Sequence, residues 1–177
     1  MEELEDPTER LKETMEAAEE KRERWTLYVA LSTAVIAVLA AIAGMLGNHH
    51  ANEAMIEQVK SSDQWAYYQS KSIKAELAAS TSQIFSALGK SLPADNAAKM
   101  EQYKADKEEI KKKAEGLEKS SEEHMNTHVI FSRAVTIFQI AIAISAIAIL
   151  TRKKLMWYAS MLLAASGCVF LVLGFLS

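Results

Sequence analysis

Residues 25–46 read WTLYVALSTAVIAVLAAIAGML, a run of 22 residues without a charged side chain. At about 1.5 Å per residue, a helix of this length reaches roughly 33 Å, enough to cross a hydrocarbon core of roughly 30 Å. Residues 134–150 form a second uncharged run of 17 residues, and residues 155–176 form a third of 22. The sequence therefore predicts an all-α integral membrane protein with three transmembrane helices.

The second span is expected to begin at residue 131, because the long stem of Arg133 lets its charged end reach the headgroups. We predict spans at 25–46, 131–150 and 155–176. Residues 1–24 are acidic and are predicted to form a cytoplasmic helix, for which Asp6 and Pro7 are typical starting residues. A cleaved signal peptide is the alternative for the first span, but the long charged segment before it favours an uncleaved anchor.

Basic residues cluster at two of the predicted membrane ends. Three of them lie within residues 21–24. The turn predicted at 151–154, between the second and third spans, contains RKK at 152–154. Because cytoplasmic loops are enriched in Lys and Arg, both clusters should face the cytoplasm. This orientation places residues 47–130 and the C-terminal Ser177 on the periplasmic side.

Residues 47–130 are predicted to form a long extracytoplasmic antiparallel helical hairpin with its turn near 89–94. No Gly or Pro occurs in residues 48–88, and GKSLP at 89–93 then ends the helix. The first arm has apolar and small residues at helical spacing, and the second arm has a heptad pattern. We expect the two patterns to face each other in one seam. They are Met55, Val59, Ser62, Ala66, Ser70, Ile73, Leu77, Thr81, Ile84 and Leu88, and Met100, Tyr103, Lys107, Ile110, Ala114, Leu117, Ser121, His124 and His128.

This seam would be weak, because it contains many Ala, Ser and Thr residues and a lysine. A single hairpin would bury little apolar area, at about 25 cal/mol per Å². We therefore expect hairpins of several copies to pack together, or an unknown protein partner to cover them.

All four histidines lie near the predicted membrane end of the hairpin, and His124 and His128 share one helix face. A turn near Ser91 would bring His124 opposite Gln58 and His128 opposite Ala54, within about one helical turn. Imidazoles with a carboxylate could hold a divalent metal, or could form a pH-responsive cluster. The alternative is that histidines suit the membrane interface. The candidate ligands are His49, His50, Glu53, His124 and His128, with Glu57 beside them.

An aromatic stretch in the first arm is a candidate interaction surface. Trp65, Tyr67 and Tyr68 are flanked by polar residues, as in many protein interfaces. The alternative is packing against the returning helix near Gly116, the only glycine of that arm, which would leave room for a ring.

The spans contain features that suit contact between helices. Gln139 is an amide inside the second span, and it is expected to hydrogen-bond across helices or, alternatively, to line a pore. Gly167 and Gly174 thin the third span, and small residues four apart occur as Ala37 with Ala41, Ala40 with Gly44, and Ala141 with Ser145.

Three stretches together resemble a known family. They are NEA at 52–54, SDQWAYYQSKSIK at 62–74, and FQIAIA at 138–143 leading to LTRKKLMWY at 150–158. They resemble a bacterial membrane family known only as domain of unknown function 4337, over most of the chain from about residue 20. The resemblance implies a bacterial inner-membrane protein, and it brings no activity or catalytic residues.

The net charge, the cysteine content and the absence of enzyme motifs bear on the class of function. The net charge of −3 gives no case for nucleic-acid binding, the one cysteine is Cys168, and no motif of an enzyme family occurs. We expect no enzyme activity and no cofactor apart from the metal considered above. The leading hypothesis is a self-associating membrane scaffold in contact with the lipid bilayer. The alternatives are an oligomeric channel or transport accessory, or a metal- or pH-responsive membrane protein.

Overall fold

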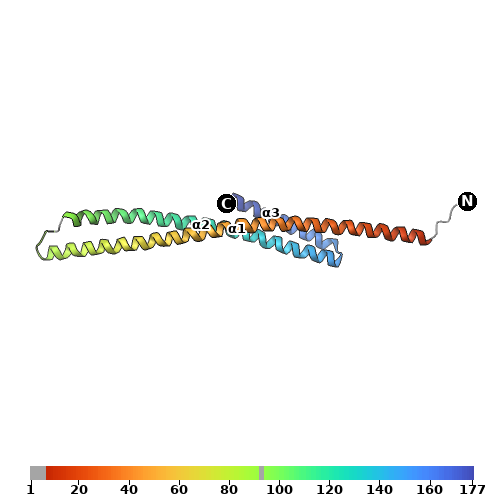
Figure 1. Ribbon diagram of the computed structural model, residues 1–177, viewed down its shortest axis with the longest axis horizontal. Helices are drawn as coiled ribbons and strands as arrows, with labels where there is room; N and C mark the ends of the chain where they lie inside the picture. Colours follow the sequence, from red (N-terminus) through yellow and green to blue (C-terminus); the bar gives the residue numbers. More distant parts are fainter. Residues whose placement is uncertain (1–6, 92–93) are drawn as a thin grey trace. The chain divides into compact units, whose positions relative to one another are not determined.

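The computed structural model describes residues 7–91 and 94–177, and this part of the chain is helical except at short connections (Figure 1). Helix α1 runs from Pro7 to Ala87, α2 from Ala94 to Thr151 and α3 from Lys154 to Leu176. No strand occurs in the two described ranges, which confirms the predicted all-α class. The cap predicted at Asp6 lies outside the described residues.

The helices divide between two units. One consists of residues 48–128 and contains only parts of α1 and α2. We call it the two-helix unit. The other contains the described residues up to Gly47 and from Val129 onward, and so includes all of α3. We call it the three-helix unit.

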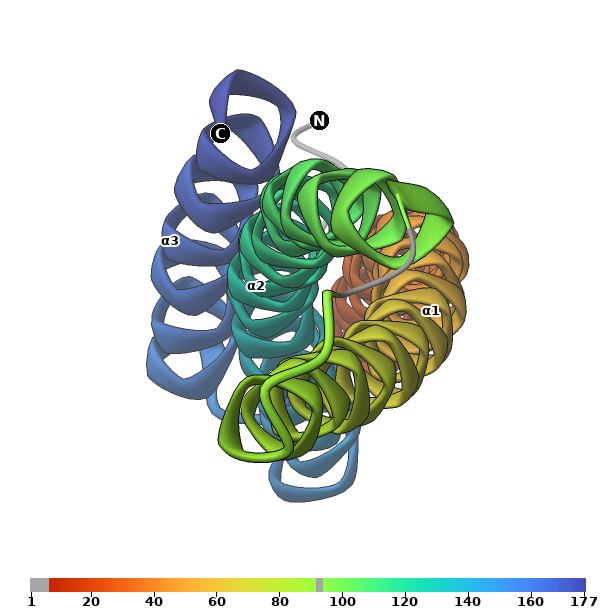
Figure 2. The same cartoon turned by 90° about the vertical axis from the view of Figure 1, so that its left-hand side faces the viewer.

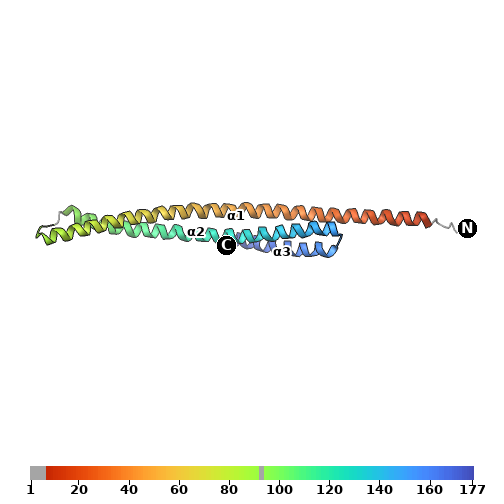
Figure 3. The same cartoon turned by 90° about the horizontal axis from the view of Figure 1, so that it is seen from below.

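Each of the three helices contains a stretch long and apolar enough to cross a membrane. These stretches all fall in the three-helix unit, where α2 from residue 129 onward lies beside α3 (Figure 3). Their apolar side chains form a shared core that includes Ile36, Ala43, Phe131, Phe138 and Leu171. The prediction of three such apolar helices is confirmed.

Two phenylalanines of α2 pack into two glycines of α3. Phe131 and Phe138 are almost completely buried, and their rings lie directly over Gly174 and Gly167. Both pairs are separated by seven residues, which is two helical turns, so antiparallel helices bring the rings and the glycines together twice. The absence of a Cβ on each glycine lets α2 and α3 approach closely.

Several hydrogen bonds from side chains connect the helices of this unit. The hydroxyls of Thr33 and Ser145 hydrogen-bond each other, and Ser160 donates to the carbonyl of Ala141 at 2.7 Å. Trp157 donates from Nε1 to the hydroxyl of Ser32 at 3.2 Å. These bonds join all three helices at the end of the unit where the basic turn between α2 and α3 lies.

In the two-helix unit, α1 and α2 run in opposite directions (Figure 2 views them from the end of α1). Helix α1 ends because Gly89 adopts a φ of 65°, which only glycine adopts without strain. The amide of Lys90 then donates to the carbonyl of Phe85, and that of Gly89 to Ser86. This arrangement satisfies the last carbonyls of the helix.

The seam between the two arms is built from alanines and serines. Ser61 donates to the carbonyl of Ala114 at 3.1 Å, and Ser121 donates to the carbonyl of Ala54 at 2.7 Å. All four residues are at most 6% exposed. Small side chains let the backbones approach closely enough for a serine on each helix to reach the other.

These contacts correct two predictions from the sequence. Ala54 lies opposite Ser121, not His128, so the expected register is wrong by about two helical turns. The heptad pattern of α2 does face α1, since Ile110, Ala114 and Ser121 are buried. The apolar stripe of α1 does not face α2, because Met55, Leu77 and the other large residues of that stripe are exposed.

Candidate functional site

The histidines of the two arms meet in a cluster. Nδ1 of His50 on α1 lies 2.9 Å from Nδ1 of His124 on α2, a hydrogen-bonding distance. The ring of His49 makes an edge contact with His50, with centroids 5.7 Å apart. His128 lies one turn further along α2 and acts electrostatically on His50. We call these four residues the histidine cluster.

The two Nδ1 atoms can share one proton but not two. In neutral imidazoles, one Nδ1 must carry a hydrogen and donate it to the lone pair of the other. If both rings are protonated, both Nδ1 atoms become donors and the acceptor is lost. The contact between His50 and His124 is therefore compatible with at most one extra proton.

The carboxylate of Glu57 on α1 lies near the ring of His124. Its Oε2 lies 4.0 Å from Nε2 of His124, on the side of the ring away from His50. Oε2 is buried and has no hydrogen-bond partner among the described residues. A protonated His124 would give this oxygen an oppositely charged neighbour, which buried carboxylates need.

The pKa of His50 is lowered from its usual value. Burial is the largest cause, because it disfavours the charged ring, and repulsion from His124, His49 and His128 adds to it. The charged form of His50 is therefore less favoured than that of a free histidine.

The cluster brings together most of the predicted metal ligands. Glu53 is half-buried on α1, and the carboxylate near the rings is instead Glu57. Across residues 7–91 and 94–177, no group of three or more His, Cys, Asp or Glu side chains is placed to hold a metal ion. The metal hypothesis stays a prediction from the sequence.

A second polar cluster lies further along the two-helix unit and was not predicted. Lys71 of α1 donates to Asp106 of α2 at 2.6 Å, and their side chains are 14% and 28% exposed. The Nζ of Lys71 also lies over the rings of Tyr67 and Tyr103, at 5.3 and 5.5 Å from the centroids. The hydrogen bond to Asp106 raises the pKa of Lys71, with a smaller contribution from Tyr67. We call Lys71, Asp106, Tyr67 and Tyr103 the lysine cluster.

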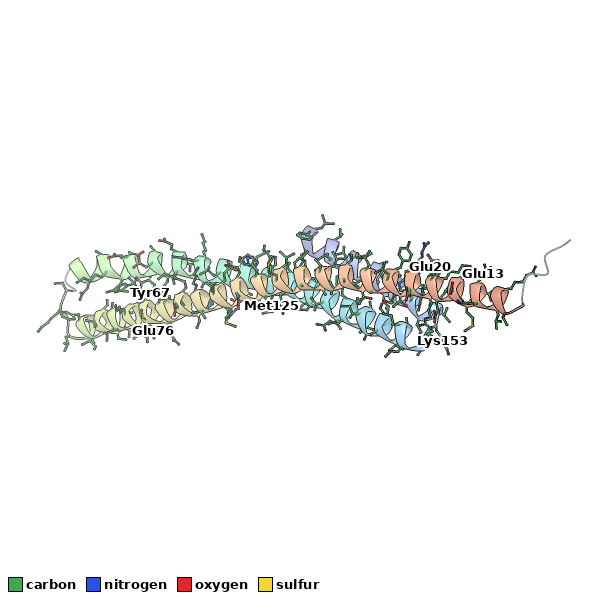
Figure 4. All side chains as sticks on the ribbon, turned by 45° about the vertical axis from the view of Figure 1, so that its right-hand side comes forward. Glu13, Glu20, Tyr67, Glu76, Met125 and Lys153 are labelled. Carbon is green, nitrogen blue, oxygen red and sulfur yellow. The ribbon has the colours of Figure 1, made fainter. Side chains whose placement is uncertain are left out.

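The three aromatic residues of the predicted interaction surface differ in their exposure. Trp65 and Tyr68 are half-buried and contact each other edge to face at 5.6 Å, and Lys107 of α2 lies over Tyr68. Tyr67 remains 47% exposed, and Figure 4 labels it on α1. The expected role of Gly116 is wrong, since a Cβ there would meet nothing within 4 Å.

Gln139 lies on the outer surface of α2. Its side chain is exposed, and no hydrogen bond joins it to another residue in the described part of the chain. Thr136, one turn away, is also exposed, but its hydroxyl donates to the carbonyl of Ser132 at 2.9 Å. Gln139 therefore differs from its neighbour in having an amide without a partner in the apolar region of the helix.

The fold and these sites define a class of all-helical proteins with three helices of membrane-spanning length and a separate two-helix unit. A model of the family described as "Domain of unknown function (DUF4337)" matches residues 25–177. The chain belongs to this family. No curated protein and no solved structure matches it.

Proposed function

We propose that this protein is a non-enzymatic, multi-pass protein of the bacterial inner membrane that self-associates and presents the two-helix unit as a periplasmic scaffold. The three apolar helices support insertion in a bilayer. The basic residues before the first span and at 152–154 support a cytoplasmic N-terminus, which leaves the two-helix unit and Ser177 outside.

The observation that most directly supports self-association is the exposed amide of Gln139. In a bilayer this side chain would face hydrocarbon, where an unpaired polar group costs several kcal/mol. A neighbouring copy presents the same amide at the same depth. A hydrogen bond between such amides contributes about 1–2 kcal/mol in model membrane helices.

The mass of the complex in nanodiscs tests this proposal. We expect a defined multimer for the unaltered protein and a shift toward monomer for Gln139→Leu. Thr136→Val is the matched control, because it removes an exposed hydroxyl that already has a backbone partner. A monomer at every protein concentration would contradict self-association.

The histidine cluster supports a second candidate function, a scaffold that responds to pH. Two Nδ1 atoms at 2.9 Å lose their hydrogen bond when both rings are charged. The groups facing the pair are His49 and Glu57 from α1 and His128 from α2. Acidification of the periplasm would then loosen this end of the seam. Measuring the separation of the two arms between labels as pH falls below 6 tests it, and an unchanged separation would argue against the response.

A further inference from the structure

Helix α1 leaves a long apolar stripe uncovered in the two-helix unit. The large members of the stripe are each between 57% and 67% exposed: Met55, Val59, Ile73, Leu77, Ile84 and Leu88. These are larger apolar side chains than most of those inside the unit, where the buried residues are Ala54, Ser61, Ile110, Ala114, Ser121 and Thr127. The two-helix unit therefore has mostly small residues inside, with Ile110 as the exception, and a row of large apolar residues outside.

The stripe has its own period. Met55, Ala66, Leu77 and Leu88 are each 11 residues apart, and Ser62, Ile73 and Ile84 repeat in the same way. Eleven residues make three turns of about 3.67 residues, so these positions stay on one line along a nearly straight helix. The seam follows a different period of seven, through Ala54, Ser61, Tyr68 and Ala75. One helix thus contains two faces with two repeats, as expected if it packs against two helices.

Two of the three polar members of the stripe, Ser70 and Thr81, already have a backbone partner within α1, and Ser62 is the third. The hydroxyl of Ser70 donates to the carbonyl of Tyr67 at 2.9 Å, and that of Thr81 donates to the carbonyl of Leu77 at 2.8 Å. Neither would be left unpaired if a neighbouring helix covered the stripe. These two hydroxyls can therefore be buried without the cost of an unsatisfied polar group.

We infer that this stripe packs against the same stripe of a second copy, with the two α1 helices parallel and in register. The inference rests on the proposed function, because copies anchored in one membrane with one orientation present the stripe at the same level. Residue 77 of one copy then meets residue 77 of the other, and the 11-residue columns face each other along their length.

The charges beside the stripe are compatible with this arrangement. On one side the stripe is bordered by Asp63 and Lys74, and on the other by Gln58, Gln69 and Ser80. In a parallel two-helix seam, the left border of one helix lies across from the right border of the other. Asp63 and Lys74 would thus face uncharged side chains, and no like charges would be opposed.

The area is sufficient for a stable contact. The stripe extends over residues 55–88, a helix length of about 50 Å, and a contact about one helix diameter wide, roughly 10 Å, buries on the order of 500 Å² per copy. Two copies together would reach about 1,000 Å², the lower limit for a specific interface.

A groove of about 520 Å³ lies beside the stripe at the end that begins with Met55. It lies between α1 and α2 and is lined by Met55 and Val59 of the stripe and by Ser121 and Met125 of α2, among others. Met125, labelled in Figure 4, is itself 45% exposed. A neighbouring helix that follows the stripe would fill this groove with its own Met55 and Val59.

Disulfide formation between copies tests the inference. In a Cys168→Ser background, Leu77→Cys places a thiol on the stripe, and the adjacent Glu76→Cys is the matched control, exposed but about 100° around the helix. A disulfide requires Cα atoms within about 7 Å. In oxidised native membranes we expect Leu77→Cys to form dimers at least about tenfold faster than Glu76→Cys, and Met55→Cys and Leu88→Cys to form them as well.

Equal rates for Leu77→Cys and Glu76→Cys would overturn the inference. The mass of the same complexes in nanodiscs separates this failure from that of the proposed function. A multimer without preferred cross-linking on the stripe leaves self-association in place and refutes this surface, whereas a monomer refutes self-association itself. As a second measurement, Ile73→Ala combined with Leu77→Ala should weaken self-association by on the order of tenfold or more. Glu76→Ala should leave it unchanged.

Discussion

In the three-helix unit, the ring of Phe138 on α2 lies directly over Gly167 of α3. A Cβ added at Gly167 would lie 2.7 Å from Cε1 and 2.8 Å from Cδ1 of the Phe138 ring. The ring is completely buried, so it cannot turn away without displacing its neighbours. A Cβ added at Gly44 would lie 3.9 Å from Val135, which is an ordinary contact. We therefore predict that Gly167→Ala destabilises the unit and that Gly44→Ala does not.

Two opposing effects set the magnitude. Replacing a helical Gly by Ala favours folding by about 0.5–1 kcal/mol, because Ala loses less backbone freedom. Adding a methyl group to a filled core costs about 1–3 kcal/mol. Gly167→Ala should then lower the free energy of unfolding by about 1 kcal/mol, with an upper limit of about 2.5 kcal/mol, whereas Gly44→Ala should raise it by about 0.5–1 kcal/mol.

Unfolding in a mixed detergent, followed by far-ultraviolet circular dichroism, measures both effects. Phe138→Leu removes the ring that the new methyl group meets, so the combination with Gly167→Ala should show a favourable coupling of about 0.5–3 kcal/mol. If Gly167→Ala raised the free energy of unfolding as much as Gly44→Ala does, the ring would not be fixed over Gly167. Gln139 follows Phe138 on α2, so it faces outward because Phe138 faces α3. That result would therefore also remove the structural reason for placing the amide of Gln139 on the outer surface.

Two further predictions concern the two-helix unit. Its free energy of unfolding should fall as the pH drops through 6.5, the usual pKa of histidine, because His50 has a lowered pKa in the folded state and the unfolded chain binds the proton first. His50→Gln should reduce this pH dependence, measured by thermal unfolding between pH 8 and 5, and an unchanged slope would argue against the cluster. Asp106→Asn should lower the thermal midpoint, since Lys71 would remain half-buried without its carboxylate. Glu101→Gln is the control, because its pairing with Lys104 is exposed, and equal effects of the two variants would contradict the prediction.

The sequence was sufficient to predict the three apolar helices, because long uncharged runs have few other stable structures. It was also sufficient to identify the buried face of α2, where a heptad pattern runs from Met100 to His128. It did not identify the buried face of α1. The largest apolar residues of that arm, such as Leu77, were expected to be inside, and the structure places them outside.

The reason is that the seam depends on close backbone approach more than on apolar area. Ala54 and Ser61 on α1 are seven residues apart, as are Ala114 and Ser121 on α2. This repeated spacing is a signal for the seam in the sequence, but its residues score lower on any hydrophobic scale than Met55 or Leu77. Hydrogen bonds from serine to the opposite carbonyl, about 1 kcal/mol each, replace part of the missing apolar burial.

The register was missed for a related reason. The connection after Gly89 was assumed to be tight around Ser91, and a shift of a few residues there displaces every opposite pair along the arms. Only pairs such as Lys71 with Asp106, or His50 with His124, fix the register, and neither is visible until the backbone positions are known. The sequence therefore does not reveal the lysine cluster, although two of its residues, Tyr67 and Lys71, lie within the aromatic stretch that resembles the family.

The position of the apolar residues supports the proposal that a second copy covers the stripe. A two-helix unit that folded alone would gain most by burying Leu77, Ile73 and Ile84 between its own arms, and the same helix instead has Ala and Ser there. Exposed apolar rows of this length are uncommon on monomers and mark binding surfaces. Since the seam is stabilised mainly by small residues and hydrogen bonds, burial of the stripe between copies would supply the apolar contact that the seam lacks. Folding of this unit and assembly of the protein would then be coupled, so variants such as Leu77→Ala should lower both the association and the thermal stability of the arms.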